Sequence, residues 1–266
     1  MSSPQKSLKT YVINLPEATD RRRFMEAQLL HFPFLDVEFV TGVRGADLSP
    51  EEFDQAVNDE QSRRTIGRAL TRGEVGSTLS HLEVMHRIER DKVAHALILE
   101  DDALISGMLG RVVSQLTAAL QPDRPRIILL TPCKYFRAKG HMINEDCAIR
   151  PFYDGFYSSG YLMNFEAARI LPAALFPFRA HLDWWKVTRQ VSGVEIDAFI
   201  PYCIGISISE NTVSFINRGS RERRPDRATQ FSEKQTAKHA CLKFGKRVRS
   251  AVFERVLGIR GQRIIF

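Results

Sequence analysis

Short apolar runs alternate with stretches of helical spacing along the N-terminal part of the chain. Residues 8–15 (LKTYVINL) are rich in β-branched and aromatic side chains and predict a buried strand. A helix is expected over residues 20–31, with Thr19 or Asp20 as its cap, and Leu35–Thr41 (LDVEFVT) predicts a second strand. This β-α-β opening indicates an α/β fold with a mainly parallel sheet.

The same alternation continues to about residue 207. Apolar side chains recur at helical spacing between residues 74 and 89, at Val75, Leu79, Leu82, Met85 and Ile88. Further elements are a helix start at 49–52, strands at 96–99, 126–130 and 157–164, a helix at 166–174, and an apolar stretch at 198–207. No apolar run reaches the ~18 residues of a transmembrane helix, and the N-terminus lacks the apolar core of a signal peptide.

Three consecutive carboxylates, Glu100, Asp101 and Asp102, follow the apolar run 96–99. Such a cluster is costly when buried unless a positive group lies beside it. In open α/β sheets ligands bind beyond the carboxyl ends of the strands, and a divalent cation there can bridge carboxylates to a diphosphate. The alternative is a helix N-terminus, whose dipole stabilises acidic side chains.

Five short motifs follow one another in the order YVINLPEATDRR, GEVGSTLSH, ALILEDDA, SSGYLMN and HLDWW. Over residues 10–216 their order and spacing resemble glycosyltransferase family 25, which includes lipopolysaccharide-type galactosyl- and glucosyltransferases and collagen-modifying galactosyltransferase domains. The resemblance implies a GT-A-like fold, with one nucleotide-binding α/β domain and a mainly parallel mixed sheet. It also implies a D-x-D-like acidic motif, a divalent metal and an inverting mechanism.

The resemblance implies a donor-site role for the acidic cluster. Glu100-x-Asp102 looks like the D-x-D motif, which implies Glu100 and Asp102 as the protein ligands of Mn²⁺ or Mg²⁺, with Asp102 in direct contact. Glu100 or Asp101 would reach the ribose or a metal-bound water. A third metal ligand is not evident from the motif, and Glu210, Asn211 or water are the candidates.

The same motif matches imply further donor-binding residues, which are Asn14, Leu15, Arg21, Arg22, Ser80, His81 and Gly160. The first two look like the family's loop against the uracil, and the arginine pair would contact the base or a phosphate. Other interpretations stay open: a solvated first helical turn for the arginines, a satisfied core histidine for His81, and close packing for Gly160.

The catalytic base implied by the resemblance is Asp183 in AHLDWW, which matches the aspartate of the family's P-V-D segment. His181 and Leu182 stand here in place of Pro and Val. A carboxylate suits the deprotonation of an acceptor hydroxyl during inversion at an anomeric carbon. Asp197 and Glu195 are the competing bases.

Two tryptophans follow the candidate base. Trp184 and Trp185 can stack on the apolar face of an acceptor sugar, or either ring can pack in the core. Asp183 then has a second interpretation, as the cap of a helix that begins near Trp184.

The positive charge of the chain is concentrated after residue 217. The whole chain carries +7, whereas fourteen Lys and Arg against four Asp and Glu give residues 218–266 a charge of +10 and leave −3 for the rest. Apolar residues among these cations from residue 234 onward predict a basic amphipathic helix on anionic lipid, or an ordinary solvated helix packed on the domain. We therefore expect a catalytic domain at 1–217 and a basic helical extension at 218–266. Nucleic-acid binding is not expected, because no recognised binding motif accompanies the charge.

Taken together, the residues and the resemblance predict transfer of a hexose, galactose or glucose, from a UDP-sugar to a lipid-linked oligosaccharide of a lipopolysaccharide or lipooligosaccharide core. Four scattered cysteines without a C-x-x-C pair favour reduced thiols in a cytoplasmic protein, peripheral at the inner face of a bacterial inner membrane. Two alternatives remain, namely a non-catalytic membrane-associated scaffold with the same fold and a metal-dependent phosphohydrolase.

Overall fold

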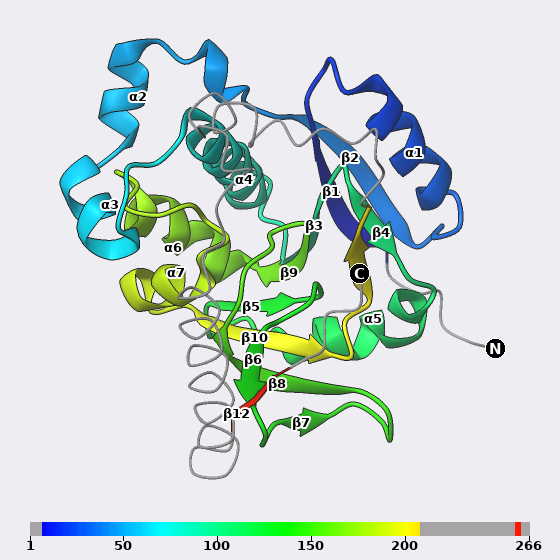
Figure 1. Cartoon of the computed structure of the whole chain (residues 1–266). Coiled ribbons are helices and arrows are strands. Elements are labelled where there is room, and N and C mark those ends of the chain that lie inside the picture. Colours follow the sequence, from blue (N-terminus) through cyan, green and yellow to red (C-terminus); the bar gives the residue numbers. More distant parts are fainter. Residues whose placement is uncertain (1–6, 208–258, 262–266) are drawn as a thin grey trace, which may run out of the picture.

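A computed structural model describes residues 7–207 and 259–261 and shows a large mixed sheet between two layers of helices (Figure 1). The central strands are, in sheet order, β10 (Glu195–Ile200), β5 (Arg126–Leu129), β9 (Gly160–Asn164), β3 (His95–Glu100), β1 (Leu8–Asn14) and β2 (Leu35–Thr41). The strands beyond β10 are β8 (Ala148–Asp154), β6 (Tyr135–Arg137), β7 (His141–Met142) and β12 (Ile259–Gly261). A separate two-stranded sheet pairs β4 (Ala103–Ile105) with β11 (Ile204–Ile206).

Among the central strands, β1, β2, β3, β5 and β10 run in one direction. β1 is parallel to β2 and β3, β5 is parallel to β10, and β9 lies antiparallel between β3 and β5. The predicted α/β fold with a mainly parallel mixed sheet is therefore confirmed for this central part. The carboxyl ends of β1 and β3 meet at one edge, which places Asn14 beside Glu100.

Helices cover both faces of the sheet. One face carries α4 (Arg72–Arg90), α6 (Phe165–Leu175) and α7 (Trp185–Ser192), and the other carries α1 (Thr19–Leu29) and α5 (Met108–Ala119). The segment between β2 and α4 holds the turn η1 (Gly45–Asp47), α2 (Pro50–Ala56) and α3 (Asp59–Ile66).

The apolar run before the acidic cluster owes its composition to burial on both faces. In β3, Ala96 and Ile98 pack with the α4 layer, whereas Leu97 and Leu99 pack with the α1 layer, and all four are fully buried. Successive side chains of a strand point to opposite faces, so both sets have to be apolar.

Local capping chemistry starts two helices as the sequence suggests. Ser49 and Glu52 form a capping box at α2, and Thr71 and Glu74 form another at α4. Both helices therefore begin where a side-chain oxygen satisfies a backbone N–H that has no partner within the helix.

The start of α1 differs from the prediction. Ala18 is its N-cap, without a side-chain cap bond in the described chain, so the prediction that Thr19 or Asp20 caps this helix is wrong. Both residues lie inside the first turn, where Asp20 instead forms an exposed ion pair with Arg23 at 3.4 Å.

Helix α4 contacts the segment after β2 very closely. A Cβ atom on Gly76 would lie 2.5 Å from the Gly45 nitrogen and 2.6 Å from the Val43 oxygen. Because both are backbone atoms, no larger residue fits at position 76 without a shift of the backbone. Glycine at this position of the GEVG motif thus sets the distance between α4 and the loop that follows β2.

Several elements were not predicted from the sequence, among them α3, α5, β4 and β6 to β8, whereas α7 matches the helix near Trp184 that was considered as an alternative. The longest of these is α5, whose buried residues Leu109, Val112, Val113 and Leu116 do have helical spacing. The others have at most eight residues, and short segments carry too few apolar positions for a reliable period.

The predicted domain boundary at 217/218 and nearly all of the basic extension lie outside the described residues, as do Glu210 and Asn211. The one described part of the extension is β12, which pairs antiparallel with β6. These three residues form a strand and no helix, and for the rest of the extension the helix stays a prediction.

In the described part of the chain no helix is both long and apolar enough to cross a bilayer. Cys133, Cys147 and Cys203 are buried there and form no disulfide with one another.

Candidate functional site

The edge at the carboxyl ends of β1 and β3 gathers the acidic cluster. Asn14 ends β1, and Glu100 ends β3 opposite Ile13. The antiparallel strand β9 begins at the same edge, since Gly160 pairs with Leu99. Residues that follow β1 and β3 and precede β9 therefore converge at one place.

Asp101 is held by two donors from the first β-α unit. Asn14 donates its Nδ2–H to Oδ2 at 2.8 Å, and Arg21 of α1 donates from Nη1 to Oδ1 at 2.8 Å. Burial nevertheless raises the pKa of Asp101, against the opposing effects of Asn14 and Arg21. Arg21 is thus a positive partner of the acidic cluster, and both oxygens of Asp101 are engaged.

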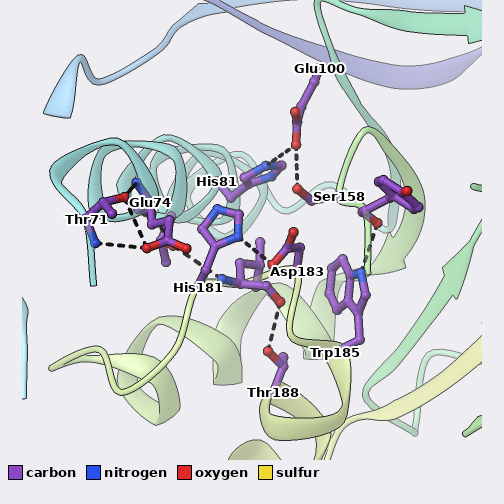
Figure 2. Close-up of polar contacts among 12 residues, drawn as sticks. Thr71, Glu74, His81, Glu100, Ser158, His181, Asp183, Trp185 and Thr188 are labelled. Carbon is purple, nitrogen blue, oxygen red and sulfur yellow. Dashed lines mark hydrogen bonds and ion pairs between the residues drawn. The ribbon is translucent and has the colours of Figure 1, made fainter. Parts of the chain in front are cut away.

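Glu100 is fixed by α4 and by the segment before β9 (Figure 2). Its Oε1 lies 3.2 Å from His81 Nε2 and accepts a hydrogen bond from Ser158 Oγ at 2.5 Å. Burial opposes ionisation of Glu100, but the hydrogen bond and charge of His81, together with Ser158, outweigh it and lower the pKa.

His81 has partners at both ring nitrogens, since Nδ1 lies 2.9 Å from the Tyr161 hydroxyl. The ring is fully buried. His81 is therefore a satisfied core histidine whose visible role is to orient Glu100.

Asp102 is the member of the cluster whose buried negative charge is not offset by its neighbours. Its buried Oδ1 has no hydrogen-bond partner among the described residues. Burial first, and then the charges of Glu100 and Asp101, raise its pKa to about 7, although Arg21 and Ser159 act in the opposite direction. An acid in this state is one that a nearby cation would stabilise.

The residues at this edge fit a divalent cation, because Asp102 offers a carboxylate oxygen without a partner next to Glu100, and hard cations prefer such oxygens. The described residues contain no cluster of three or more His, Cys, Asp or Glu suited to a metal. A cation bound at Asp102 would therefore complete its shell with diphosphate oxygens, water or residues outside the described part.

Two other sequence candidates, Ser80 and Gly160, have structural contacts of their own. Ser80 Oγ accepts from the Val43 N–H at 2.7 Å and donates to the Gly76 carbonyl at 2.8 Å, so it fixes α4 to the loop after β2. A Cβ atom on Gly160 would lie 2.7 Å from the Ile204 side chain, so close packing already explains the glycine.

The structure separates the two neighbouring arginines. Arg21 reaches Asp101, whereas Arg22 pairs with Glu26 at 2.9 Å and lies over the ring of Phe39 in β2 at 4.1 Å. Leu15 is half-buried directly after β1, next to Asn14. Their contacts with a nucleotide stay predictions.

Asp183 lies between α6 and α7 and is bound to a buried histidine. His181 Nδ1 lies 2.6 Å from Asp183 Oδ1, and the side chains are 5% and 25% exposed, respectively. The N-cap of α7 is Trp184, without a side-chain cap bond in the described residues, so the alternative role of Asp183 as a helix cap is not observed.

His181 is surrounded by acids. Burial disfavours its charged form, but the hydrogen bond and charge of Asp183, followed by the charges of Glu100 and Glu74, raise its pKa overall. Within the described chain its buried Nε2 has no hydrogen-bond partner. Figure 2 shows the ring between Glu74 and Asp183, below His81.

Glu74, in the first turn of α4, lies on the other side of His181 from Asp183 (Figure 2). It accepts hydrogen bonds from both Arg68 Nη atoms at 2.8 and 2.5 Å and from the Thr71 N–H at 2.9 Å. Burial would raise its pKa, but Arg68, Thr71 and the charge of His181 lower it. Glu74 thus stays ionised beside the histidine.

The two tryptophans have different environments. Trp185 is fully buried, donates its Nε1–H to the Tyr157 carbonyl at 3.0 Å, and meets the Tyr161 ring edge-on at 5.2 Å. Trp184 is half-buried and makes an edge contact with Phe156 at 5.3 Å. Core packing therefore accounts for Trp185.

The competing bases lie at the other edge of the sheet. Asp197 is buried and pairs with Arg126 at 2.6 Å, and Glu195 begins β10. Since β10 runs in the same direction as β3, its first residues lie away from Glu100 at the end of β3. Asp183, by contrast, is bound to His181, whose pKa the charge of Glu100 raises.

Sequence reasoning missed Ser158 and the pairing of His181 with Asp183. The signals were present, as a Ser-Ser pair before the Gly160 strand and as a His-x-Asp spacing. The partner of Ser158, Glu100, is 58 residues away in the sequence, and a His-x-Asp spacing alone does not show that the two side chains meet.

A protein-family model matches most of the chain. The family model described as "Glycosyltransferase family 25 (LPS biosynthesis protein)" matches residues 7–184. That range contains the acidic cluster, His81, His181, Asp183 and Trp184.

Two curated proteins are similar to parts of the chain. A "Glycosyltransferase 25 family member" of Anopheles gambiae is 39% identical over 101 residues, which cover 35% of this chain and 16% of that protein. The "Putative glycosyltransferase R655" of Acanthamoeba polyphaga mimivirus is 27% identical over 172 residues, covering 62% of this chain and 52% of that protein. The chain thus spans about half or less of the length of these relatives.

Solved structures resemble the fold distantly. A glycosyltransferase involved in the glycosylation of the major capsid of PBCV-1 gives a TM-score of 0.38 at 10% identity, covering 81% of this chain and 98% of its own. Mouse xyloside xylosyltransferase 1 gives 0.38 at 15% identity, covering 74% and 73%. Similarity at this level does not indicate a reaction.

Proposed function

Because this chain belongs to glycosyltransferase family 25, and is a glycosyltransferase on that ground, we propose that it transfers galactose or glucose with inversion from a UDP-sugar to a lipopolysaccharide or lipooligosaccharide core glycan. The observation that carries the proposal is a pair of acidic centres at one region of the fold. Asp102 has a carboxylate oxygen without a partner in the described residues. Asp183 has a partly exposed carboxylate that pairs with buried His181, and the charge of Glu100 also raises the pKa of this histidine.

The donor would bind at the carboxyl edge of β1 and β3. Asn14 and Arg21 hold Asp101, which leaves the segment after β1 preorganised for a base and ribose. Asp102 and Glu100 would hold Mn²⁺ or Mg²⁺, which would supply positive charge to the leaving diphosphate. Ser158 and His81 keep Glu100 ionised and oriented for that role.

Asp183 would act as the base. The acceptor hydroxyl oxygen attacks the anomeric carbon, the bond from that carbon to the diphosphate oxygen breaks, and the hydroxyl proton passes to the Asp183 carboxylate. Buried His181 holds Oδ1 of the carboxylate at 2.6 Å, and the Asp183 side chain is 25% exposed. Positioning of this kind contributes to the rate by holding the base in a reactive geometry.

The lipid-linked acceptor gives the basic extension a function. Residues 218–266 carry a net charge of +10, and each cation near an anionic membrane surface contributes about 1 kcal/mol to binding. We therefore place the protein in the cytoplasm, at the inner face of a bacterial inner membrane. Vesicle sedimentation with and without anionic lipid tests this part of the proposal.

Calorimetric titration with UDP, UDP-galactose and UDP-glucose, in Mn²⁺ and in EDTA, tests the donor site. We expect metal-dependent binding that Asp102→Ala abolishes and that Asp123→Asn, an exposed change at the opposite edge, leaves intact. Binding that persists in EDTA would remove the metal from the proposal and keep the nucleotide. No binding in either condition would favour the scaffold, and release of phosphate from simple esters would favour the phosphohydrolase.

Transfer to an acceptor glycan, followed by mass spectrometry, tests the base. Asp183→Asn should abolish transfer while UDP binding and the circular dichroism spectrum stay unchanged. Unchanged turnover in this variant would remove Asp183 from its assigned role.

A further inference from the structure

Two aromatic rings beside Asp183 form a small exposed surface. The Phe156 and Trp184 rings are 5.3 Å apart at an interplanar angle of 74°. Phe156 is 37% exposed and Trp184 is half-buried, so neither ring is fully covered in the described structure. We define these two residues as the aromatic ledge. Trp184 follows Asp183 directly in the sequence, so the ledge adjoins the candidate base.

The ledge is rigidly supported from below. Tyr157 has a φ of 82°, which is unusual for a residue with a side chain and needs surrounding structure to maintain it. Its carbonyl accepts the indole N–H of the fully buried Trp185 at 3.0 Å and the Thr131 hydroxyl at 3.3 Å. Phe156 precedes Tyr157 and Trp184 precedes Trp185, so this hydrogen bond joins the two segments that carry the exposed rings.

The same segment connects the ledge to the donor acids. Ser158, two residues after Phe156, donates to Glu100 at 2.5 Å, and the Ser159 carbonyl accepts the Glu100 N–H at 3.1 Å. Residues 155–159 thus contact Glu100 of the proposed donor site through Ser158 and Ser159, and carry the exposed phenyl ring of Phe156 near their other end. The ledge therefore lies next to both centres of the proposed reaction.

We propose that the ledge binds the acceptor sugar, with the apolar face of a pyranose ring stacked on Phe156 and Trp184. This inference rests on the proposed function. The acceptor hydroxyl has to reach the Asp183 carboxylate, so the sugar ring that carries this hydroxyl must lie beside Asp183. The ledge is an apolar surface next to that residue. Aromatic side chains offer a large, rigid contact area at low entropic cost, which suits a ring that has to be oriented for attack.

The inference separates the two tryptophans. Trp184 contacts the sugar, whereas Trp185 supports the loop from within the core. The chain has two tryptophans in all, so labelling with 5-fluorotryptophan gives one ¹⁹F signal for each, and Trp184→Phe assigns them. The probes are methyl β-galactoside and methyl β-lactoside, added with UDP and Mn²⁺ present, and acyclic sorbitol is the control ligand.

We expect the Trp184 signal to shift saturably with both glycosides and not with sorbitol, while the Trp185 signal stays in place. Phe156→Ala should weaken glycoside binding about five- to tenfold, as expected for the loss of one aromatic contact. In transfer assays the same change should raise the acceptor KM by a similar factor and leave the donor KM unchanged. Phe176→Ala is the matched control, because Phe176 is also an exposed ring in an edge contact, with Phe178 at 5.6 Å.

Failure of this inference can be told from failure of the proposed function. UDP binding without any glycoside shift at Trp184, or an equal effect of Phe156→Ala and Phe176→Ala, overturns the ledge and leaves the transferase intact. A glycoside shift at Trp184 without UDP binding overturns the UDP-sugar donor and keeps the ledge as a sugar site.

Discussion

The pairing of His181 with Asp183 predicts how stability depends on pH. Replacing Asp183 by asparagine removes the negative charge 2.6 Å from His181 Nδ1 but keeps the size of the side chain. Glu74 and Glu100 remain and still favour the charged imidazole, whereas burial disfavours it. Since Asp183 acts more strongly than either of those acids, the pKa of His181 should fall in the variant.

The sign follows from proton linkage. In the wild type the pKa of His181 is raised in the folded state, so its stabilising contribution is fully present below the unfolded value of about 6.5 and is lost as the pH rises through the folded pKa. A hydrogen bond to a charged group contributes about 1.5–3 kcal/mol when buried, and Asp183 is only partly exposed. We therefore expect Asp183→Asn to lower the free energy of unfolding by about 1–3 kcal/mol below pH 6.5, and by less at alkaline pH.

Urea denaturation followed by circular dichroism, from acidic to alkaline pH, measures this difference. Asp123→Asn provides the control for an exposed aspartate, and NMR of the His181 ring carbons reports its titration directly. A deficit that stays constant across the whole pH range would refute the reasoning, because it would mean that Asp183 does not control the charge of His181.

Three further predictions follow from the contacts at the edge of the sheet. In EDTA, Asp102→Asn should raise the free energy of unfolding in urea by about 2–4 kcal/mol near pH 8, because the wild-type carboxyl has a pKa of about 7 when folded. This gain should fade as the pH falls toward 4. Its absence near pH 8 would contradict the burial of an uncompensated acid. Arg21→Ala should weaken UDP binding about tenfold or more in calorimetry, whereas Arg22→Ala should change it less than about twofold, because Arg21 alone of the two pairs with Asp101; equal effects would argue against the placement. Gly76→Ala should cost about 2–3 kcal/mol in thermal or urea unfolding, whereas Gly107→Ala, whose Cβ would meet no described atom within 4 Å, should be neutral or slightly stabilising.

The sequence predicts the central strands well, and burial is the reason. β3 and β5 are buried on both faces, so each contains a continuous apolar run, and the predicted bounds of β1, β2, β3 and β5 match the observed ones to within about a residue. The strands beyond β10 are partly exposed or only two or three residues long, and their pairing comes from remote segments, so no local period marks them.

The candidate site, like the fold, could be predicted from the sequence only in part. Motif order alone selected Glu100, Asp102 and Asp183, and it could select Arg21 and Arg22 only as a pair. The distinction between the two arginines depends on which side of α1 faces Asp101, eighty residues away in the case of Arg21. The raised pKa of His181 likewise depends on Glu74 and Glu100, whose proximity appears only in the folded chain.

Helix α4 connects the two acidic centres. It carries Glu74 in its first turn, beside His181, and His81 two turns later, beside Glu100. Residues seven apart lie on the same side of an α-helix, about 10 Å from one another along its axis, so one rigid element sets the spacing between the proposed base and the proposed metal ligands. Gly76 lies between these two residues and sets how closely α4 packs against the loop after β2. A larger residue at position 76 should therefore impair donor binding and base positioning together, whereas a change at Arg21 should affect the donor alone.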